Sequence, residues 1–138
     1  MLSSKRVGLG LVQLIVLVLL SAWCAGCSRS SMTITAEKSY DGRTINLRVG
    51  DGVKVTLAEN PTTGYKWDFL SRPEPVCVIV TDAYVANTSA GLMGAGGVHN
   101  WEFRAVDKGT ASVRLGYRRP WEKDAAPAQT FTLTLVVK

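Results

Sequence analysis

The chain is poor in the residues from which most active sites are built. Its 138 residues include one histidine, His99, and three cysteines. An enzyme needs a nucleophile, a base or a set of metal ligands, and a zinc site needs several cysteine or histidine ligands. A dyad of Cys77 and His99 is disfavoured, because Cys77 lies in an apolar run where its thiol would be hard to ionise. The sequence therefore predicts a protein that is not an enzyme and that holds no metal or cofactor.

Disulfides and clustered positive charge are also missing. Cys24 and Cys27 lie close together near the N-terminus, so the rest of the chain has a single thiol and no internal disulfide. Its stability must then come from a hydrophobic core. The formal net charge is +5, but the basic residues are scattered along the sequence. This pattern lacks the basic patch of a nucleic-acid-binding protein, so no nucleic-acid partner is expected.

The longest apolar stretch lies near the N-terminus. Residues 9–20 are interrupted by Gln13 and form a run too short to predict a membrane-spanning helix. The run follows Lys5 and Arg6 and precedes small residues, which is the pattern of a secretory signal peptide. Residues 24–27 resemble a bacterial lipobox, with cysteine at the position where leucine is usual.

This resemblance implies a processed lipoprotein. We expect a lipoprotein signal peptide at residues 1–26, lipidation of Cys27, a tether at residues 27–35 and a folded domain at residues 36–138. A retained signal anchor is the alternative. The lipid anchor would be the chain's contact with a membrane, in a bacterial cell envelope, facing the periplasm or at the outer membrane. Ser28 is compatible with the outer membrane, since the aspartate that usually retains lipoproteins at the inner membrane is missing.

The rest of the chain has the pattern of strands. No segment shows helical periodicity over three turns, whereas many short segments alternate apolar and polar residues. Seven or eight strands separated by turns predict an all-β sandwich. We expect an edge strand at residues 32–36, a hairpin turn at residues 50–52 and a central strand, covered on both faces, at residues 76–84. The alternation also predicts that three aromatic side chains enter the core: Tyr65, Trp67 and Phe69.

Three segments rich in glycine, proline or both lie between predicted strands. Residues 60–65 hold two threonines between Pro61, which fixes its own backbone, and Gly64, which permits a positive φ. Residues 94–97 have almost no side chains, so their backbone can approach a partner closely. Residues 119–121 place a rigid bend beside a tryptophan, a residue type enriched among binding hot spots. Long loops on a rigid sandwich often carry binding sites, so we predict that these loops form the functional site.

The three segments, in this order, resemble the signature loops of the chagasin family, the protein inhibitors of papain-like cysteine proteases. The resemblance extends from about residue 45 to residue 138. It implies an immunoglobulin-like β-sandwich of seven to eight strands with the three binding loops at one end. It also implies that the protease is contacted by the following residues: Asn60, Pro61, Thr62, Thr63, Gly64, Tyr65, Gly94, Ala95, Gly96, Gly97, Arg119, Pro120 and Trp121.

The resemblance also gives each loop a place in the active-site cleft of the target. Thr62 and Thr63 would lie nearest the catalytic cysteine and histidine of the protease, and Tyr65 stands at the family's aromatic position. The loop of residues 94–97 and the loop containing Trp121 would clamp the two flanks. Inhibition would be tight, reversible and non-covalent, with proteases of the cathepsin L type as expected targets.

A second interpretation remains open from the residues alone. A periplasmic β-sandwich binding module, specific for an assembly partner or a carbohydrate, would use an exposed Trp121 and the same long loops. Such a module has no need for Thr62 and Thr63. Those two residues therefore discriminate between the inhibitor and the binding module.

Overall fold

The computed structural model describes residues 29–88, 94–122 and 124–138. Residues 1–28, with the predicted signal peptide and Cys27, lie outside this part of the chain. Ser31–Lys138 form one compact unit, and the buried apolar cluster of that unit lies between Ala36 and Val137. The unit therefore has a hydrophobic core of its own. Among the described residues, no helix has the length and apolar character needed to cross a membrane.

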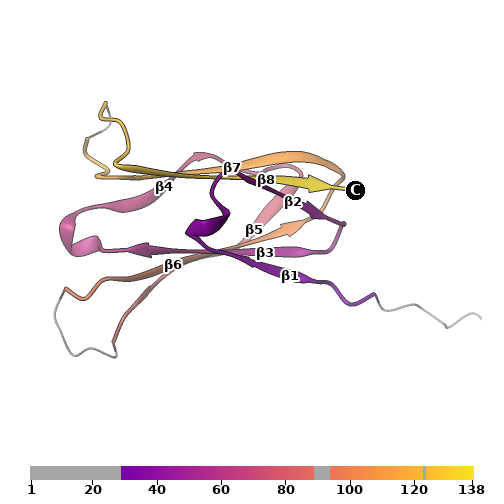
Figure 1. Cartoon of the computed structure of the whole chain (residues 1–138), viewed down its shortest axis with the longest axis horizontal. Coiled ribbons are helices and arrows are strands. Elements are labelled where there is room, and N and C mark those ends of the chain that lie inside the picture. The colour runs from indigo at the N-terminus through magenta and orange to yellow at the C-terminus, as the bar shows by residue number, and fades with distance from the viewer. Residues whose placement is uncertain (1–28, 89–93, 123) are drawn as a thin grey trace, which may run out of the picture. The chain divides into compact units, whose positions relative to one another are not determined.

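Eight strands in the described residues form two sheets that face each other as the layers of a sandwich (Figure 1). One sheet has the order β1-β3-β6-β5 and the other has the order β2-β8-β7-β4. Neighbouring strands are antiparallel, except that β1 runs parallel to β3 and β2 parallel to β8. The predicted all-β, immunoglobulin-like sandwich is confirmed. The elements are β1 (Thr33–Ala36), the 3-10 helix η2 (Lys38–Tyr40), β2 (Arg43–Leu47), β3 (Gly52–Glu59), the 3-10 helix η3 (Pro61–Thr63), β4 (Lys66–Ser71), β5 (Cys77–Ala86), β6 (Gly97–Ala105), β7 (Gly109–Arg118) and β8 (Gln129–Val137).

The core follows from the alternation along the strands. On β3, Val53, Val55 and Leu57 point to the inner face and are buried. On β8, every second residue from Phe131 to Val137 is buried in the same way. Because successive side chains of a strand point to opposite faces, each sheet presents one apolar face to the other.

The aromatic prediction holds for two of its three residues. Trp67 is buried, and Phe69 packs against the core from the second sheet. The Phe69 ring meets Trp101 and Phe103 of the first sheet edge to face, with centroids 6.3 Å apart in each pair. Tyr65, in contrast, is not in the core: it is half-buried at the end of the sandwich where the candidate site lies.

The prediction of a central strand at residues 76–84 is wrong. Among the described strands, β5 pairs with β6 alone and forms an edge of its sheet. Val78, Val80 and Val85 are between 38% and 53% exposed. β-branched residues are favoured in strands whether or not both faces are covered, so the apolar run did not require burial. Cys77 is fully buried at the start of β5, as predicted, and this burial raises the pKa of its thiol.

The hairpin predicted at residues 50–52 is also wrong, because the turn joins strands of different sheets. β2 pairs with β8, whereas β3 pairs with β1 and β6. Side-chain hydrogen bonds hold the turn instead of a strand ladder. The carboxylate of Asp51 accepts the backbone N–H of Arg48 at 3.0 Å and that of Met32 at 3.1 Å.

The edge strand predicted at residues 32–36 is confirmed, and it overlaps the end of the predicted tether. β1 begins at Thr33 and pairs in parallel with β3, from Thr33 opposite Gly52 to Ala36 opposite Val55. The last three residues of the predicted tether, 33–35, therefore belong to the sandwich. Only Ala36 of this short strand is buried, so its alternation gives a weak signal in the sequence.

The core predicts a large difference between two leucines of the sheet β2-β8-β7-β4. Leu115→Ala removes a fully buried side chain and should lower the free energy of unfolding by about 3 kcal/mol. Leu70, which is 39% exposed, provides the matched control, and Leu70→Ala should cost less than about 1 kcal/mol. Urea unfolding of both variants measures the difference. Equal losses would show that the core is not where the structure places it.

Candidate functional site

The three predicted loops lie at one end of the sandwich (Figure 1). The first loop, residues 60–65, joins β3 to β4, and the second joins β5 to β6. Residues 89–93 of the second loop lie outside the described chain, and Gly97, predicted within it, is the first residue of β6. The third loop, residues 119–128, joins β7 to β8, with residue 123 outside the described chain.

Local hydrogen bonds shape the first loop into a 3-10 turn. The side-chain oxygen of Asn60 accepts from the Thr62 hydroxyl at 2.6 Å and from the Thr62 N–H at 3.3 Å. The Thr63 hydroxyl donates to the Asn60 carbonyl at 2.7 Å. Asn60 thus acts as an N-cap and Pro61 occupies the first position of the turn, where its missing N–H costs nothing. Both threonines are exposed on a backbone that is already fixed.

The base of the first loop is attached to both sheets. The Asn60 N–H donates to the hydroxyl of Tyr117 on β7 at 3.1 Å. The Tyr65 ring stacks on the Tyr117 ring, with centroids 5.3 Å apart. On β4, the indole N–H of Trp67 donates to the Ala58 carbonyl of β3 at 2.9 Å. These contacts fix the two ends of the loop relative to each other.

The second loop packs against the first through backbone atoms. The Asn60 side-chain amide donates to the Gly94 carbonyl at 3.4 Å. Between the two strands that carry the second loop the backbones are also close, because a Cβ atom on Gly97 of β6 would lie 2.2 Å from the Val85 carbonyl oxygen of β5. Real Cβ atoms do not come so close to a carbonyl oxygen, so this position requires glycine. The near absence of side chains therefore permits contact within the protein as well as contact with a partner.

The third loop covers the other side of the first. A Cβ atom on Gly64 would lie 2.5 Å from Cη2 of Trp121, so the indole rests directly on this glycine. Trp121 remains 67% exposed, as its charged neighbours predicted. The guanidinium of Arg119 lies over the Tyr65 ring, 4.7 Å from its centroid, and is 3.3 Å from the Glu122 carboxylate. The three loops thus form one continuous surface.

This surface offers shape and apolar area for binding. Trp121 contributes an exposed indole, and the two threonines form the tip between the other loops.

The two residues of the disfavoured catalytic dyad, Cys77 and His99, lie far apart along the sheet. Cys77 is opposite Ala105 near one end of β6, whereas His99 is opposite Tyr84 near the other. Within the described residues, no group of three acidic, histidine or cysteine side chains is placed to hold a metal ion.

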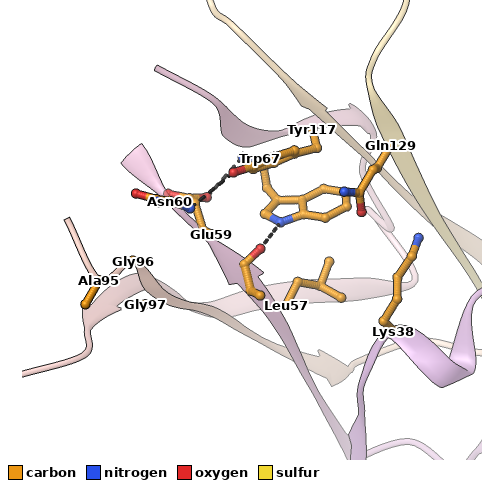
Figure 2. Close-up of a pocket in the computed structure, with 11 residues that line it drawn as sticks. Lys38, Leu57, Glu59, Asn60, Trp67, Ala95, Gly96, Gly97, Tyr117 and Gln129 are labelled. Carbon is orange, nitrogen blue, oxygen red and sulfur yellow. Dashed lines mark hydrogen bonds between the residues drawn. The ribbon is translucent and has the colours of Figure 1, made fainter. Parts of the chain in front are cut away.

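A cavity of about 340 Å³ lies behind the first two loops (Figure 2). Its walls include the Trp67 indole, the Lys38 amine and the buried carboxylate of Glu59. Figure 2 shows Trp67 beside Tyr117, whose ring centroid is 5.1 Å away. The sequence prediction missed Glu59 and Tyr117 as supports of the loops. The alternation on β3 contains a signal for Glu59, because it continues the inward series of Val53, Val55 and Leu57 with an acid.

Comparison with known proteins identifies relatives along most of the chain. The chain is 32% identical to chagasin from Trypanosoma cruzi over 108 residues, covering 75% of this chain and 97% of chagasin. It is 29% identical to amoebiasin-2 from Entamoeba histolytica over 110 residues, covering 79% of this chain and 88% of the relative. The crystal structure of the cysteine protease inhibitor EhICP2 from Entamoeba histolytica superposes with a TM-score of 0.71 at 27% identity, covering 78% and 97% of the two chains.

The family assignment follows from both the sequence and the fold. The sequence model of the family described as "chagasin family peptidase inhibitor I42" matches residues 46–135. These residues contain β3 to β7 and all three loops. Each loop that carries a family motif in the sequence lies at the same end of the sandwich in the structure. This chain therefore belongs to the chagasin family of peptidase inhibitors.

Proposed function

We propose that this protein inhibits papain-like cysteine proteases by placing its three joined loops in the active-site cleft. The observation that carries the proposal is the contact between the loops: Asn60 bonds to Gly94, and Trp121 covers Gly64. Loops that are already ordered lose less conformational entropy when they bind. The first loop would enter the cleft while the other two contact its flanks.

The shape of the first loop explains why inhibition would be reversible. Its backbone curls into a 3-10 turn, in which the Gly64 N–H donates to the Pro61 carbonyl at 3.0 Å. A curled backbone does not present an extended peptide bond to the catalytic cysteine, and Pro61 has no N–H to pair with the enzyme. The loop would therefore occupy the catalytic centre without being cleaved. Family membership favours this function over the carbohydrate or assembly module.

The target class is proposed to be of the cathepsin L type. The support is the match of all three loop motifs, including Trp121 as an exposed apolar anchor. A large indole needs an apolar wall on the protease, and it adds contact area with few rotatable bonds to immobilise.

The cellular location of the protein is a separate proposal, which rests on the resemblance of residues 24–27 to a lipobox. We propose that cleavage before Cys27 leaves a lipidated cysteine, so that a bacterial cell envelope holds the inhibitor through its N-terminus. The folded unit begins at Ser31, which leaves a short polar tether after Cys27. The inhibitor would then face the periplasm or act at the outer membrane.

Palmitate labelling of the full chain in a bacterial host tests the lipid anchor. Cys27→Ser should abolish both the label and the sedimentation of the protein with membranes. Cys24→Leu restores the usual lipobox residue and should keep both. A label that persists in Cys27→Ser would contradict the assignment of the lipid to Cys27. Sedimentation with membranes that persists without any label would favour a retained signal anchor.

Titration of residues 28–138 against papain, with trypsin as a control enzyme, tests the inhibitor function. Papain activity should fall stoichiometrically and recover on dilution, while trypsin is unaffected. Thr62→Arg and Thr63→Arg should each raise the inhibition constant by more than about thirtyfold, because a bulky charge at the tip opposes entry into a narrow cleft. Thr110, an exposed threonine at the far end of β7, provides the matched control Thr110→Arg.

Two results would contradict this prediction. A folded domain that leaves papain and a cathepsin fully active would favour the binding module. Inhibition by Thr62→Arg and Thr63→Arg as strong as that of the unaltered protein would remove the first loop from the cleft.

Matched substitutions at two glycines test whether the position of the Trp121 side chain matters for inhibition. Gly64 and Gly42 have similar positive φ angles, 81° and 76°, but only Gly64 is covered by Trp121. Gly64→Ala and Gly42→Ala should both lower stability by about 1 kcal/mol through backbone strain. Only Gly64→Ala should weaken papain inhibition, by about thirtyfold, since its methyl group displaces the indole.

Trp121→Ala completes this comparison. It should weaken inhibition as much as Gly64→Ala does, and combining the two changes should add little, because both act on the same indole. Equal inhibition constants for Gly64→Ala and Gly42→Ala, measured with papain, would show that the contact between Trp121 and Gly64 is not used.

A further inference from the structure

The only histidine of the chain lies between two carboxylates beneath the loops. Nδ1 of His99 is 3.0 Å from the Glu59 carboxylate, and Nε2 is 2.7 Å from the Asp82 carboxylate. The imidazole ring is stacked on the Trp101 indole, with centroids 4.1 Å apart and planes 2° from parallel. Three strands, β3, β5 and β6, contribute to this arrangement.

Two hydrogen bonds donated by the ring require a doubly protonated imidazole. A neutral imidazole has one N–H, so it can donate to only one of two carboxylates, whereas the imidazolium donates to both. Glu59 is only 4% exposed, and a positive charge beside a buried carboxylate compensates for its lost hydration. The face of Trp101 also favours a cation. The ring can therefore donate to both carboxylates at once only when His99 carries a second proton.

The other groups around this cluster add few charges. On β5, the residue directly opposite His99 is Tyr84, and on β3 it is Leu57. Lys38 lines the same cavity as Glu59, but its amine is 2.9 Å from the carboxylate of Asp41. These neighbours leave His99 as the group with direct contacts to both carboxylates.

The cluster holds the ends of two loops. Glu59 directly precedes the first loop, and its carboxylate also accepts the N–H of Trp67, just after that loop, at 3.0 Å. One carboxylate therefore joins both ends of the first loop. His99 lies two residues beyond Gly97, where the second loop enters β6. A protonated His99 thus connects the base of the first loop with both strands that carry the second.

We propose that His99 is a positioning residue for inhibition, which holds the first two loops in their binding arrangement most firmly when its imidazole is doubly protonated. This inference rests on the proposed inhibitor function. His99 contacts no protease in this arrangement and acts through Glu59. Inhibition is then strengthened in acidic surroundings and weakened as the pH rises and the second N–H is lost.

Inhibition constants for papain at pH 5 and pH 7.5 test the proposal with residues 28–138. Each variant is compared with the unaltered protein at the same pH, so that the enzyme's own pH dependence cancels. His99→Gln should weaken inhibition roughly tenfold at pH 5, the effect of one lost charged hydrogen bond, and much less at pH 7.5. Asp82→Asn should give a smaller change in the same direction, since the bond to Glu59 remains.

A matched control comes from the other end of the same sheet. Asp107 is exposed beyond β6, and its carboxylate accepts the N–H of Lys108. Asp107→Asn removes one acid without touching the cluster, and it should keep the pH profile of the unaltered protein. A profile changed equally by Asp107→Asn and Asp82→Asn would show a general charge effect and overturn the proposal.

Thermal unfolding without protease separates this inference from the proposed function. Lowering the pH from 7.5 to 5 should raise the unfolding temperature of the unaltered protein more than that of His99→Gln. The reason is that the hydrogen bonds from a doubly protonated His99 to Glu59 and Asp82 exist at the lower pH and are lost as the pH rises. If this difference in unfolding temperature is found but papain is not inhibited, the proton-dependent cluster is supported and the inhibitor function is overturned. Identical pH profiles for the unaltered protein and His99→Gln in both assays would overturn the role of His99.

Discussion

The chain crosses from one sheet to the other at residues 60–65, and the candidate site depends on how that crossing is held. β3 and β4 belong to different sheets, so no strand ladder joins the two ends of the loop. Three other hydrogen bonds do so: Trp67 donates from its indole to Ala58 and from its backbone to Glu59, and Tyr117 accepts from Asn60. A hairpin would fix its loop by pairing, whereas this loop is fixed by side chains from both layers.

The same dependence extends to the other loops. The second loop is attached to the first through Asn60, and the third covers it through Trp121 and Arg119. Three independent loops would each lose conformational entropy on binding, but loops that restrain one another have lost much of it on folding. Rigidity at the crossing therefore benefits all three contact regions. It also means that a change at the base of the first loop is transmitted to the others.

The sequence predicted those parts of the structure that depend on local patterns. The alternation of Val53, Val55 and Leu57 located an inward-facing strand, and glycine and proline located the loops. The motifs then indicated which loops carry the binding residues. The errors concern pairing between distant segments. The apolar run at residues 76–84 is equally compatible with an edge or a central strand, and residues 50–52 turn the chain without showing which sheet it enters.

Local sequence patterns could not predict which residues hold the bases of the loops, for the same reason. Glu59 and His99 are separated by 40 positions and meet only because β3 and β6 are neighbours in register. Tyr117 reaches Asn60 across the two layers. An inward-facing acid on β3 was visible in the sequence, but its partner was not, since pairing in a sandwich follows from topology. Family resemblance did not supply it either, because the motifs describe the tips of the loops and not their bases.

The separation of charged groups from the tips of the first two loops has a consequence for binding. The first loop and residues 94–97 carry no acidic or basic side chain, while Glu59, His99 and Asp82 lie beneath them. Charges at the tips would have to be desolvated in the cleft of a partner, which opposes association unless each one is paired there. Charges at the base are already paired within the protein. The tips of the first two loops can therefore bind through shape and apolar contact, while the proposed role of His99 is to hold them in place from beneath.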